Sequence, residues 1–258
     1  MIPIVTVAQM RTIDKEAIGG ETTVGFGYML KAGMGILETV RKLQPDPAGG
    51  DIAIVCGKGN NGGDGYVAGG LLIDAGYNVM VFGLFDRDEL RGEALMAFDE
   101  YALRKGNFLL LDDIEELNQL SRYSLVIDAI LGSGIQGDPR GSAAKAIQAV
   151  NACGRPVLAV DTPSGLDNDT GNPGNPCISA ATTVAMGFPK LGTLFYPGRR
   201  QVGALVIRDL GYPDDITTKH HGKIFTPTND FLRKTLPRRR PAGSKIEHGL
   251  VLMVCGSG

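Results

Sequence analysis

The sequence has few cysteines, and none of them is spaced as in a disulfide framework or a metal site. The four residues, Cys56, Cys153, Cys177 and Cys255, lie far apart along the 258-residue chain and form no Cys-x-x-Cys pair. Small secreted domains and zinc sites instead carry closely spaced cysteines. The pattern predicts reduced thiols and favours a cytoplasmic protein.

Long apolar runs and leader-like segments are missing as well. No stretch reaches the ~18 apolar residues that a membrane-spanning helix requires. The N-terminus lacks a basic region followed by an apolar core, so we expect no signal peptide. The formal net charge of −2 gives no overall attraction to nucleic acid or to a membrane surface. We therefore expect neither a nucleic acid nor a membrane as partner.

Basic residues are concentrated toward the end of the chain. Residues 216–258 hold eight Lys or Arg and two acidic residues, and three consecutive arginines, residues 238–240, stand between two prolines. Such a run can bind nucleic acid or a membrane. Because it has no interleaved aromatic residues and prolines flank it, we interpret it as a solvated linker.

From residue 51 onward, apolar runs alternate with helical patterns. The runs show no period of two, which is typical of strands buried on both faces of a parallel sheet. Strands that alternate with helices predict an α/β protein with right-handed crossovers. The expected strands are residues 52–55, 78–82, 108–111, 125–130, 156–160, 182–186 and 204–207; the expected helices are residues 6–18, with Thr6 as N-cap, 28–43, 66–75, 87–105, 114–120 and 142–152.

The helix expected at residues 28–43 contains the small residues Ala32, Gly33 and Gly35. Small side chains allow a neighbouring element to approach closely. That neighbour is either another helix of the same chain, which we favour, or a second subunit.

A glycine-rich segment after the first of these strands is the first candidate site. Residues 57–65 read Gly-Lys-Gly-Asn-Asn-Gly-Gly-Asp-Gly and join an apolar strand to an expected helix. Free backbone N–H groups and the helix dipole make such a junction an anion site. Its glycines let the backbone approach a ligand closely. The alternative is a glycine turn with a structural role only.

The polar residues of this segment distinguish it from an ordinary dinucleotide turn. Glycines at positions 57, 59 and 62 fit the dinucleotide fingerprint, which is a weak signal when it stands alone. Asn60, Asn61 and Asp64 add two amides and a carboxylate. We interpret the segment as a site for the polar groups of a nucleotide.

Two further loops that follow strands carry polar residues. The first begins at Asp128 and continues into a Gly-Ser-Gly-x-x-Gly turn, residues 132–137, which suits a second phosphate. The second, residues 161–167, reads Asp-Thr-Pro-Ser-Gly-Leu-Asp. Ligands of open α/β sheets bind beyond the carboxyl ends of the strands, where these loops lie. The structural alternatives are an Asp128 that accepts backbone N–H bonds and an Asp161 that caps a turn.

Asp64, Asp128 and Asp161 are each placed to reach one crevice. Like charges raise a carboxyl pKa, which would make one of them an acid or base near neutral pH. A monovalent cation would relieve the repulsion, and the oxygens of Asn61, Asp128 and Ser164 suit a hard cation. Lys190 follows a strand at the same edge, and we interpret it as a solvated lysine, with a role in the site as the alternative.

Taken in order, these three motifs resemble those of the NAD(P)HX epimerases of the YjeF N-terminal type. The similarity covers residues 6–215. It implies an α/β protein with a Rossmann-like three-layer αβα sandwich and a mostly parallel sheet, usually as a homodimer. It also implies an isomerase of nicotinamide nucleotide repair, which interconverts the R and S hydrates of NADH and NADPH. These damaged cofactors, NAD(P)HX, carry a hydroxyl at C6 of the nicotinamide ring.

The resemblance also implies roles for individual residues. Asp161 is expected to be the catalytic acid/base, and Asn61, Asp128 and Ser164 are expected to hold a potassium ion. The residues implied in binding the substrate NAD(P)HX are Asn60, Asn61, Gly62, Gly63, Asp64, Gly132, Ser133, Gly134, Ile135, Gln136, Gly137, Asp138 and Asp161.

The end of the chain resembles the opening of a second enzyme domain. Residues 245–258 are similar to the start of the ribokinase-like ADP-dependent NAD(P)HX dehydratase domain, which follows the epimerase in bifunctional proteins. We expect the epimerase domain at residues 1–217, a linker at 218–244 and a truncated start of the dehydratase at 245–258. Dehydratase activity is expected to be absent from the chain.

Two other functions remain open. An NAD(P)-dependent oxidoreductase would use the glycine fingerprint, but the acid expected about 20 residues later is displaced into a loop, at Asp86. A non-catalytic nucleotide-binding scaffold would need only the fold. Three carboxylates at strand ends argue against a scaffold, so we favour the enzyme.

Overall fold

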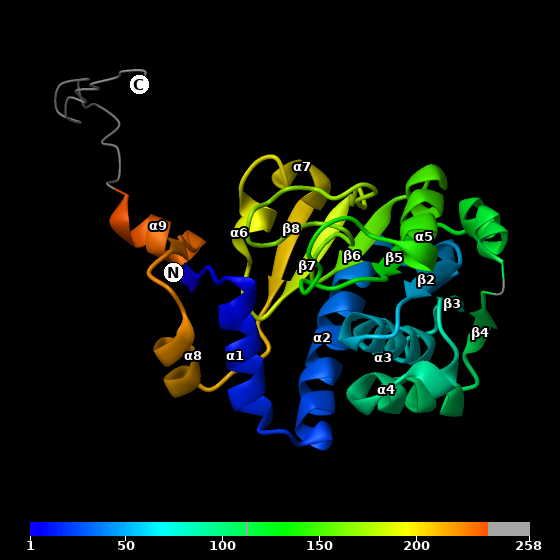
Figure 1. Cartoon of the computed structure of the whole chain (residues 1–258), viewed down its shortest axis with the longest axis horizontal. Coiled ribbons are helices and arrows are strands. Elements are labelled where there is room, and N and C mark those ends of the chain that lie inside the picture. The colour runs from blue at the N-terminus through cyan, green and yellow to red at the C-terminus, as the bar shows by residue number, and fades with distance from the viewer. Residues whose placement is uncertain (112, 237–258) are drawn as a thin grey trace. The chain divides into compact units, whose positions relative to one another are not determined.

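The structure is a computed structural model of the chain and describes residues 1–111 and 113–236. It divides into a large unit, Pro3–Ile224, and a small one made of Met1–Ile2 and the described chain from Phe225 onward (Figure 1). The small unit contains strand β9 (Phe225–Thr226) and helix α9 (Asn229–Thr235). The dehydratase-like segment expected at residues 245–258 lies outside the described residues, as does the linker expected at 218–244 from residue 237 on.

A parallel sheet of seven strands forms the centre of the large unit. Its order is β4-β3-β2-β5-β6-β7-β8, and every neighbouring pair is parallel. The strands are β2 (Ile52–Cys56), β3 (Val79–Gly83), β4 (Asn107–Leu110), β5 (Leu125–Ala129), β6 (Val157–Val160), β7 (Thr182–Met186) and β8 (Ala204–Arg208). All seven expected strands are confirmed, with ends that differ by one residue at most; β1 (Ile2–Pro3) precedes them.

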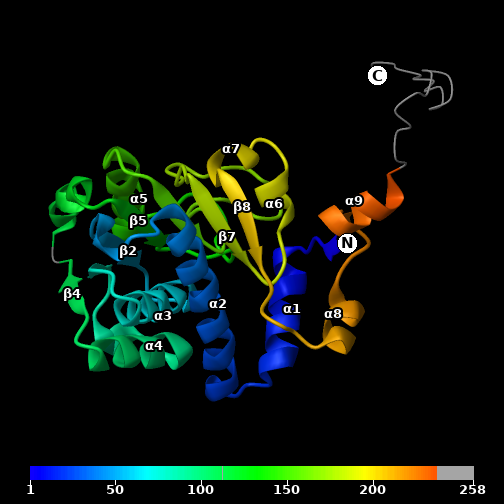
Figure 2. The same cartoon turned by 180° about the vertical axis from the view of Figure 1, so that it is seen from behind.

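Helices cover both faces of this sheet (Figures 1 and 2). Helices α2 (Thr22–Leu43), α3 (Asn60–Asp74) and α4 (Gly92–Leu103) pack on one face. Helix α5 (Gly141–Ala152) and the 3-10 helix η3 (Ile114–Arg122) pack on the other. The predicted three-layer α/β fold is therefore confirmed. The remaining described helices are α1 (Val7–Ile18), η1 (Pro47–Gly49), η2 (Arg87–Glu89), α6 (Leu191–Leu194), α7 (Arg199–Val202) and α8 (Asp214–His220).

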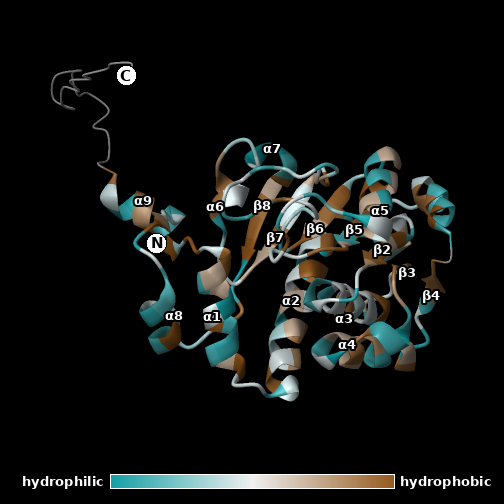
Figure 3. Ribbon diagram, in the orientation of Figure 1, coloured by the Kyte–Doolittle hydropathy of each residue, from teal (hydrophilic) through white to brown (hydrophobic). Residues whose placement is uncertain are grey.

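The strands are apolar throughout because both of their faces are buried. In β2, Ile52 and Ile54 belong to the core beneath α2, α3 and α4, whereas Ala53 and Val55 belong to the core beneath α5 and η3. Figure 3 shows hydrophobic residues along the central strands and mixed character on the helices. None of the described helices combines the length and the apolar character needed to cross a membrane.

Helix α1 begins directly after Thr6, as predicted, and Thr6 forms a capping box with Gln9.

Two other helices begin earlier than their sequence patterns predict, and both starts contain glycines. Helix α2 begins at Thr22 rather than residue 28, and α3 begins at Asn60 rather than residue 66. Glycines weaken helix propensity, so packing rather than local sequence sets these starts. The glycine-rich segment is thus largely helical and not a loop.

The small residues of α2 pack within the chain. A Cβ on Gly33 would lie 2.5 Å from Val67 Cγ1, and one on Gly35 would lie 2.5 Å from Arg208 Cγ. Ala32 is buried. The favoured prediction of intrachain packing is confirmed, and the alternative that these three residues contact a second subunit is wrong.

Candidate active site

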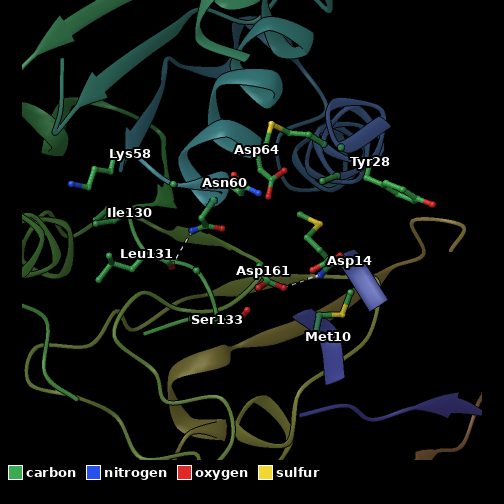
Figure 4. A pocket seen from close by; sticks show the side chains of 18 of the residues that line it. Met10, Asp14, Tyr28, Lys58, Asn60, Asp64, Ile130, Leu131, Ser133 and Asp161 are labelled. Carbon is green, nitrogen blue, oxygen red and sulfur yellow. Dashed lines mark hydrogen bonds between the residues drawn. The ribbon is translucent and has the colours of Figure 1, made fainter. Parts of the chain in front are cut away.

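A cavity of about 440 Å³ lies at the carboxyl ends of β2, β5 and β6. Helices α1 and α2 and the start of α3 complete its wall (Figure 4). Its volume falls in the range typical of small-molecule sites. The cavity therefore lies where the topology of a parallel sheet places ligands.

The glycines at the start of α3 allow that helix to dock on neighbouring backbone. A Cβ on Gly57 would lie 2.0 Å from the Ile130 carbonyl oxygen, and one on Gly62 would lie 1.9 Å from the Gly57 carbonyl oxygen. Of these three, Gly59, the N-cap of α3, has no described atom within 4 Å of its Cβ position. For Gly57 and Gly62 the structure thus shows a reason for glycine that the sequence did not reveal, the close packing of protein backbone. Close approach of a ligand to these glycines stays a prediction.

Three of the polar residues named from the sequence meet at Leu131. The Asn61 side-chain amide donates to the Leu131 carbonyl at 3.0 Å, and the Leu131 amide donates to Ser164 Oγ at 2.8 Å. Ser164 Oγ in turn donates to Asp128 Oδ1 at 2.6 Å. The structure thus brings together Asn61, Asp128 and Ser164, which come from α3, β5 and the loop after β6.

Asp128 is fully buried without a basic side chain in contact. Its carboxylate also accepts the amides of Ser164 at 2.9 Å and Ile130 at 3.2 Å, as the structural interpretation of the sequence expected. Burial raises its pKa to about 6, and the hydrogen bonds from Ser164 and Ile130 oppose the rise. Ionised Asp128 therefore lacks a countercharge within the described residues.

These residues fit a hard monovalent cation. Asn61 Oδ1 is buried and has no hydrogen-bond partner within residues 1–111 and 113–236, so an acceptor oxygen is left over beside a carboxylate. A buried acceptor without a partner is costly and calls for an explanation. No cluster of three or more His, Cys, Asp or Glu side chains that would hold a metal ion occurs in that same part of the chain. The donor set is one carboxylate with neutral oxygens.

Asp161 lies at the end of β6 in an unusual backbone conformation. Its φ of 63° is in the left-handed region, which costs free energy for a residue other than glycine. Its amide donates to the Val184 carbonyl at 2.8 Å, and its Oδ1 accepts the Met186 amide at 3.2 Å. These contacts hold the carboxylate at the wall of the cavity.

Lys190 forms a buried ion pair with Asp161. Its Nζ lies 2.5 Å from Asp161 Oδ1, and the residue is 1% exposed. A second contact joins Nζ to the Met186 carbonyl at 3.3 Å. The favoured interpretation of Lys190 as a solvated lysine is wrong, because the chain before α6 turns this side chain inward, where its charge requires a partner.

Asp64, on the second turn of α3, faces the cavity without a hydrogen bond from any described residue. Burial raises its pKa well above the ordinary value, and the nearby Asp161 and Asp14 raise it further. Both effects favour the protonated form of the Asp64 carboxyl. The sequence predicted a crevice reached by Asp64, Asp128 and Asp161. In the structure Asp14, Asp64 and Asp161 line the cavity, whereas Asp128 is buried behind its wall.

Asp14 and the aromatic residues beside it were missed in the sequence. The Tyr212 hydroxyl donates to Asp14 Oδ1 at 2.5 Å, and the Tyr212 ring stacks on Tyr28 with centroids 4.7 Å apart. Burial is the main cause that raises the pKa of Asp14, and the Tyr212 hydrogen bond opposes it. Asp14 lies in a predicted helix, but only the packing of α1 shows that it reaches the site.

The loop predicted to bind a second phosphate reaches the cavity with its first half only. Gly132, Ser133 and Gly134 line the cavity, and Arg11 donates to the Gly134 carbonyl at 3.2 Å. Residues 135–138 do not line it, and Asp138 accepts the Asn175 amide at 2.8 Å. In the glycine-rich segment, Asn60, Asn61 and Asp64 line the cavity, whereas Gly62 and Gly63 are buried behind it.

Comparisons with known proteins agree with this picture. The chain is 38% identical, over 98% of its length, to the bifunctional NAD(P)H-hydrate repair enzyme Nnr of Moorella thermoacetica, of which it covers 49%. It thus spans about half the length of such bifunctional relatives. It is 31% identical to the NAD(P)H-hydrate epimerase of Rhodopirellula baltica, with 82% of this chain and 86% of that protein covered.

A solved structure and a family profile complete the comparison. The crystal structure of yeast ynu0, YNL200c, has a TM-score of 0.71 and 24% identity over 87% of this chain and 96% of that one, which supports the fold. The profile described as YjeF-related protein N-terminus matches residues 27–192. The family predicted from the motifs is confirmed: the chain belongs to the family of the YjeF-related protein N-terminus.

Proposed function

We propose that the chain is an NAD(P)HX epimerase, which interconverts the R and S hydrates of NADH and NADPH. The observation that carries the proposal is the cavity in which the Asp161–Lys190 ion pair and the Asp64 carboxyl face one space. A fixed carboxylate beside a carboxyl group whose raised pKa favours its protonated form suits proton transfer to and from a hydroxyl group. Family membership and the names of the relatives support this reaction.

The start of α3 suits the phosphate groups of such a substrate. The first N–H groups of a helix lack intrahelical partners and favour an anion together with the helix dipole. Asn60 is exposed at this end, and Gly132, whose Cβ position lies 3.3 Å from Asn61 Cβ, brings the Gly132–Gly134 backbone to the same part of the cavity. We assign substrate binding to the residues that line the cavity, Asn60, Asn61, Asp64, Gly132, Ser133, Gly134 and Asp161. The other residues implied by the resemblance, Gly62, Gly63 and 135–138, remain proposed on that resemblance alone.

Asp161 is the acid/base that acts on the ring hydroxyl in this proposal. Its carboxylate, which the Lys190 ammonium contacts at 2.5 Å, accepts a proton from a hydroxyl or a water at C6. Reversible loss and return of the hydroxyl accounts for inversion at that carbon. Epimerisation in ¹⁸O-labelled water should place label at C6, and epimerisation without exchange would exclude this route.

We propose that a potassium ion binds between Asn61, Asp128 and Ser164, which the structure brings together around Leu131. When bound, it supplies a positive charge that offsets the buried Asp128 carboxylate. Asn61 Oδ1 and the Asp128 carboxylate would be its ligands together with Ser164 Oγ. These residues hold the start of α3 to the loops after β5 and β6, so their role is to fix the walls of the substrate site.

We also propose a homodimer, on the basis of the resemblance. Leu30 and Met34 lie one turn apart on α2 and are exposed, which gives this helix an apolar surface. Sedimentation of the purified chain would test the dimer, with Met34→Glu as the variant expected to weaken it. A sedimentation coefficient of a monomer at all concentrations would contradict it.

The domain organisation is a proposal of the same kind. Residues 1–217 are proposed as the epimerase domain and 245–258 as the start of a dehydratase domain, supported by the greater length of the bifunctional relatives.

The reaction can be tested with purified epimers. The chain should bring pure R-NADHX and pure S-NADHX to the same mixture, measured by chromatography, without any added oxidant or reductant. A non-catalytic scaffold would bind the hydrates and leave both epimers unchanged. An NAD(P)-dependent oxidoreductase would leave them unchanged and would transfer a hydride to a second substrate.

A further inference from the structure

Inversion at C6 requires proton transfers on two sides of the nicotinamide ring. When the hydroxyl leaves, the C6–O bond breaks, its electron pair goes to oxygen, and an acid must supply the proton that completes a water molecule. The N1 lone pair then forms a C6=N1 double bond. Water that adds from the other side forms a new C6–O bond, returns the pair to N1 and gives a proton to a base. The proton balance thus needs one protonated and one ionised group.

The cavity presents two carboxyl groups with different surroundings. Asp161 approaches from the end of β6 and is paired with Lys190 at 2.5 Å. Asp64 approaches from α3, on the other side of the same space in Figure 4. No hydrogen bond from the described residues reaches the Asp64 carboxyl, so its oxygens are available to a ligand.

The charges around Asp64 explain why it keeps its proton. Asp14 faces it from α1, Asp161 from the end of β6 and Lys190 from the chain before α6. Tyr212 donates to Asp14 at 2.5 Å, and Tyr28 from α2 stacks on Tyr212. Burial and the Asp14 carboxylate raise the pKa of Tyr212, so its hydroxyl stays a donor.

Three carboxyl groups therefore share one ammonium group at a cavity wall where Asp161 and Lys190 are buried and Asp14 and Asp64 are half-buried. If all three were ionised, the cluster would carry two uncompensated negative charges, which partial removal from water disfavours. Asp161 has Lys190 as its partner, and the Tyr212 hydroxyl donates to Asp14. No described residue gives Asp64 either kind of partner, so a proton on the cluster is best placed on Asp64.

We propose that Asp64 is the proton donor to the leaving C6 hydroxyl and that Asp161 accepts the proton of the water that adds on the other side. This inference rests on the proposed epimerase function and assigns Asp64 a catalytic role beyond substrate binding. In the reverse direction the two groups exchange roles. One turnover moves one proton from Asp64 to Asp161, and the following reverse turnover or exchange with solvent returns it.

The Asp64→Asn variant separates proton transfer from binding. The amide keeps the size and a hydrogen-bond donor but cannot give up a proton. We expect kcat for R-NADHX to fall by about 10²–10⁴-fold, the usual contribution of a general acid, with KM changed only a few-fold. Asp215→Asn, an exposed carboxylate on α8 outside the cavity, is the matched control and should keep the wild-type kcat.

The Asp14→Asn variant tests the proton on Asp64, because a purely structural role of Asp64 would leave the pH profile of kcat/KM unchanged. Its removal deletes a negative neighbour that raises the pKa of Asp64, so the basic limb of the kcat/KM–pH profile should shift to lower pH. Infrared spectra of the wild type at pH 7 should show the C=O band of a protonated carboxyl that is missing in Asp64→Asn. The band is measured without substrate.

Two results would overturn the inference alone, and a third would overturn the proposed function as well. An Asp64→Asn variant that folds, lacks the infrared band and keeps kcat within a few-fold while KM rises would overturn the inference and leave the epimerase intact. A wild-type band that persists in Asp64→Asn would overturn it too, because the proton would then lie on another group. A wild-type chain that interconverts neither epimer would overturn the proposed function, and the inference with it.

Discussion

Asp161 is held at the cavity wall by contacts that compensate for its backbone strain. A residue other than glycine at φ 63° persists only when its surroundings fix it. Here the Val184 carbonyl, the Met186 amide and the Lys190 ammonium provide those contacts. The result is a carboxylate whose position is set before any substrate arrives, as electrostatic catalysis requires.

Replacement of Lys190 should reveal the strength of the buried pair. In Lys190→Met the Asp161 carboxylate remains buried without its partner, and we expect the free energy of unfolding to fall by about 3 kcal/mol, near the lower end for a broken buried pair. Urea denaturation measures this loss. Epimerase activity should fall as well, because the Asp161 carboxylate loses the ammonium group that holds it at the cavity wall.

A surface pair supplies the control for this prediction. Lys219 pairs with Glu16 at 2.9 Å, and its side chain is 61% exposed. Lys219→Met should cost much less unfolding free energy than Lys190→Met, because solvent screens the interaction. Equal losses in the two variants would show that the Asp161–Lys190 pair contributes no more than a surface contact.

At the scale of the elements, the start of α3 connects the fold to the site. Its glycines permit contact with the ends of β2 and β5, and this contact carries Asn61 to Leu131 and Asp64 to the cavity. Docking at this point thus positions both the proposed cation ligand and the proposed proton donor.

Substitution of Gly62 tests this docking. A Cβ at Gly62 would lie 1.9 Å from the Gly57 carbonyl oxygen, so Gly62→Ala must displace backbone. We expect a loss of about 2 kcal/mol or more in unfolding free energy, within the range for overpacked sites, together with weaker substrate binding. Chemical denaturation and a binding titration with NADHX are the measurements.

Gly27 in α2 offers the opposite case. No atom lies within 4 Å of its Cβ position, so Gly27→Ala should raise the unfolding free energy by about 0.5–1 kcal/mol through helix propensity. If Gly62→Ala also raised the unfolding free energy, the result would contradict the close contact between Gly62 and the Gly57 carbonyl.

The sequence predicted the strands more accurately than the starts of the helices, and the difference has physical causes. Strands buried on both faces leave continuous apolar runs, so all seven were found. The starts of α2 and α3 were missed because glycines conceal helices that tertiary packing stabilises. Asp64 and Asp161 were found because they occur in local motifs, whereas Asp14, Lys190 and Tyr212 reach the site only through the packing of distant segments.

At the scale of the whole molecule, the buried carboxyl groups make stability depend on pH. Asp128 has a pKa of about 6 in the folded protein against an ordinary value of 3.8. The folded state therefore binds the proton more tightly than the unfolded state, and the stability that this adds below pH 4 is lost as the pH rises through about 6. The raised pKa of Asp64 acts in the same direction.

The contribution of Asp128 can be isolated. In potassium-free buffer, the wild type should lose about 3 kcal/mol more than Asp128→Asn between about pH 4 and pH 7, since one pKa unit corresponds to about 1.4 kcal/mol. Urea denaturation at a series of pH values measures the difference. Parallel curves for the two proteins would contradict the raised pKa.

Potassium should reduce this loss at neutral pH. A cation that binds the ionised Asp128 stabilises the folded state by an amount that grows with the logarithm of one plus its concentration divided by its dissociation constant. The melting temperature of the wild type at pH 7 should rise with potassium chloride and stay unchanged with tetramethylammonium chloride at equal ionic strength. Asp128→Asn should show no such difference, and an equal response of both proteins would argue against the site.

The most direct test of the account is the rate at which the chain interconverts R-NADHX and S-NADHX, measured beside Asp161→Ala. Chromatographic separation of the two epimers provides the readout. We predict fast equilibration by the wild type and a loss of about 10²-fold or more in the variant, which lacks the acid/base group. Equal, slow rates for wild type, variant and buffer alone would contradict the proposed epimerase.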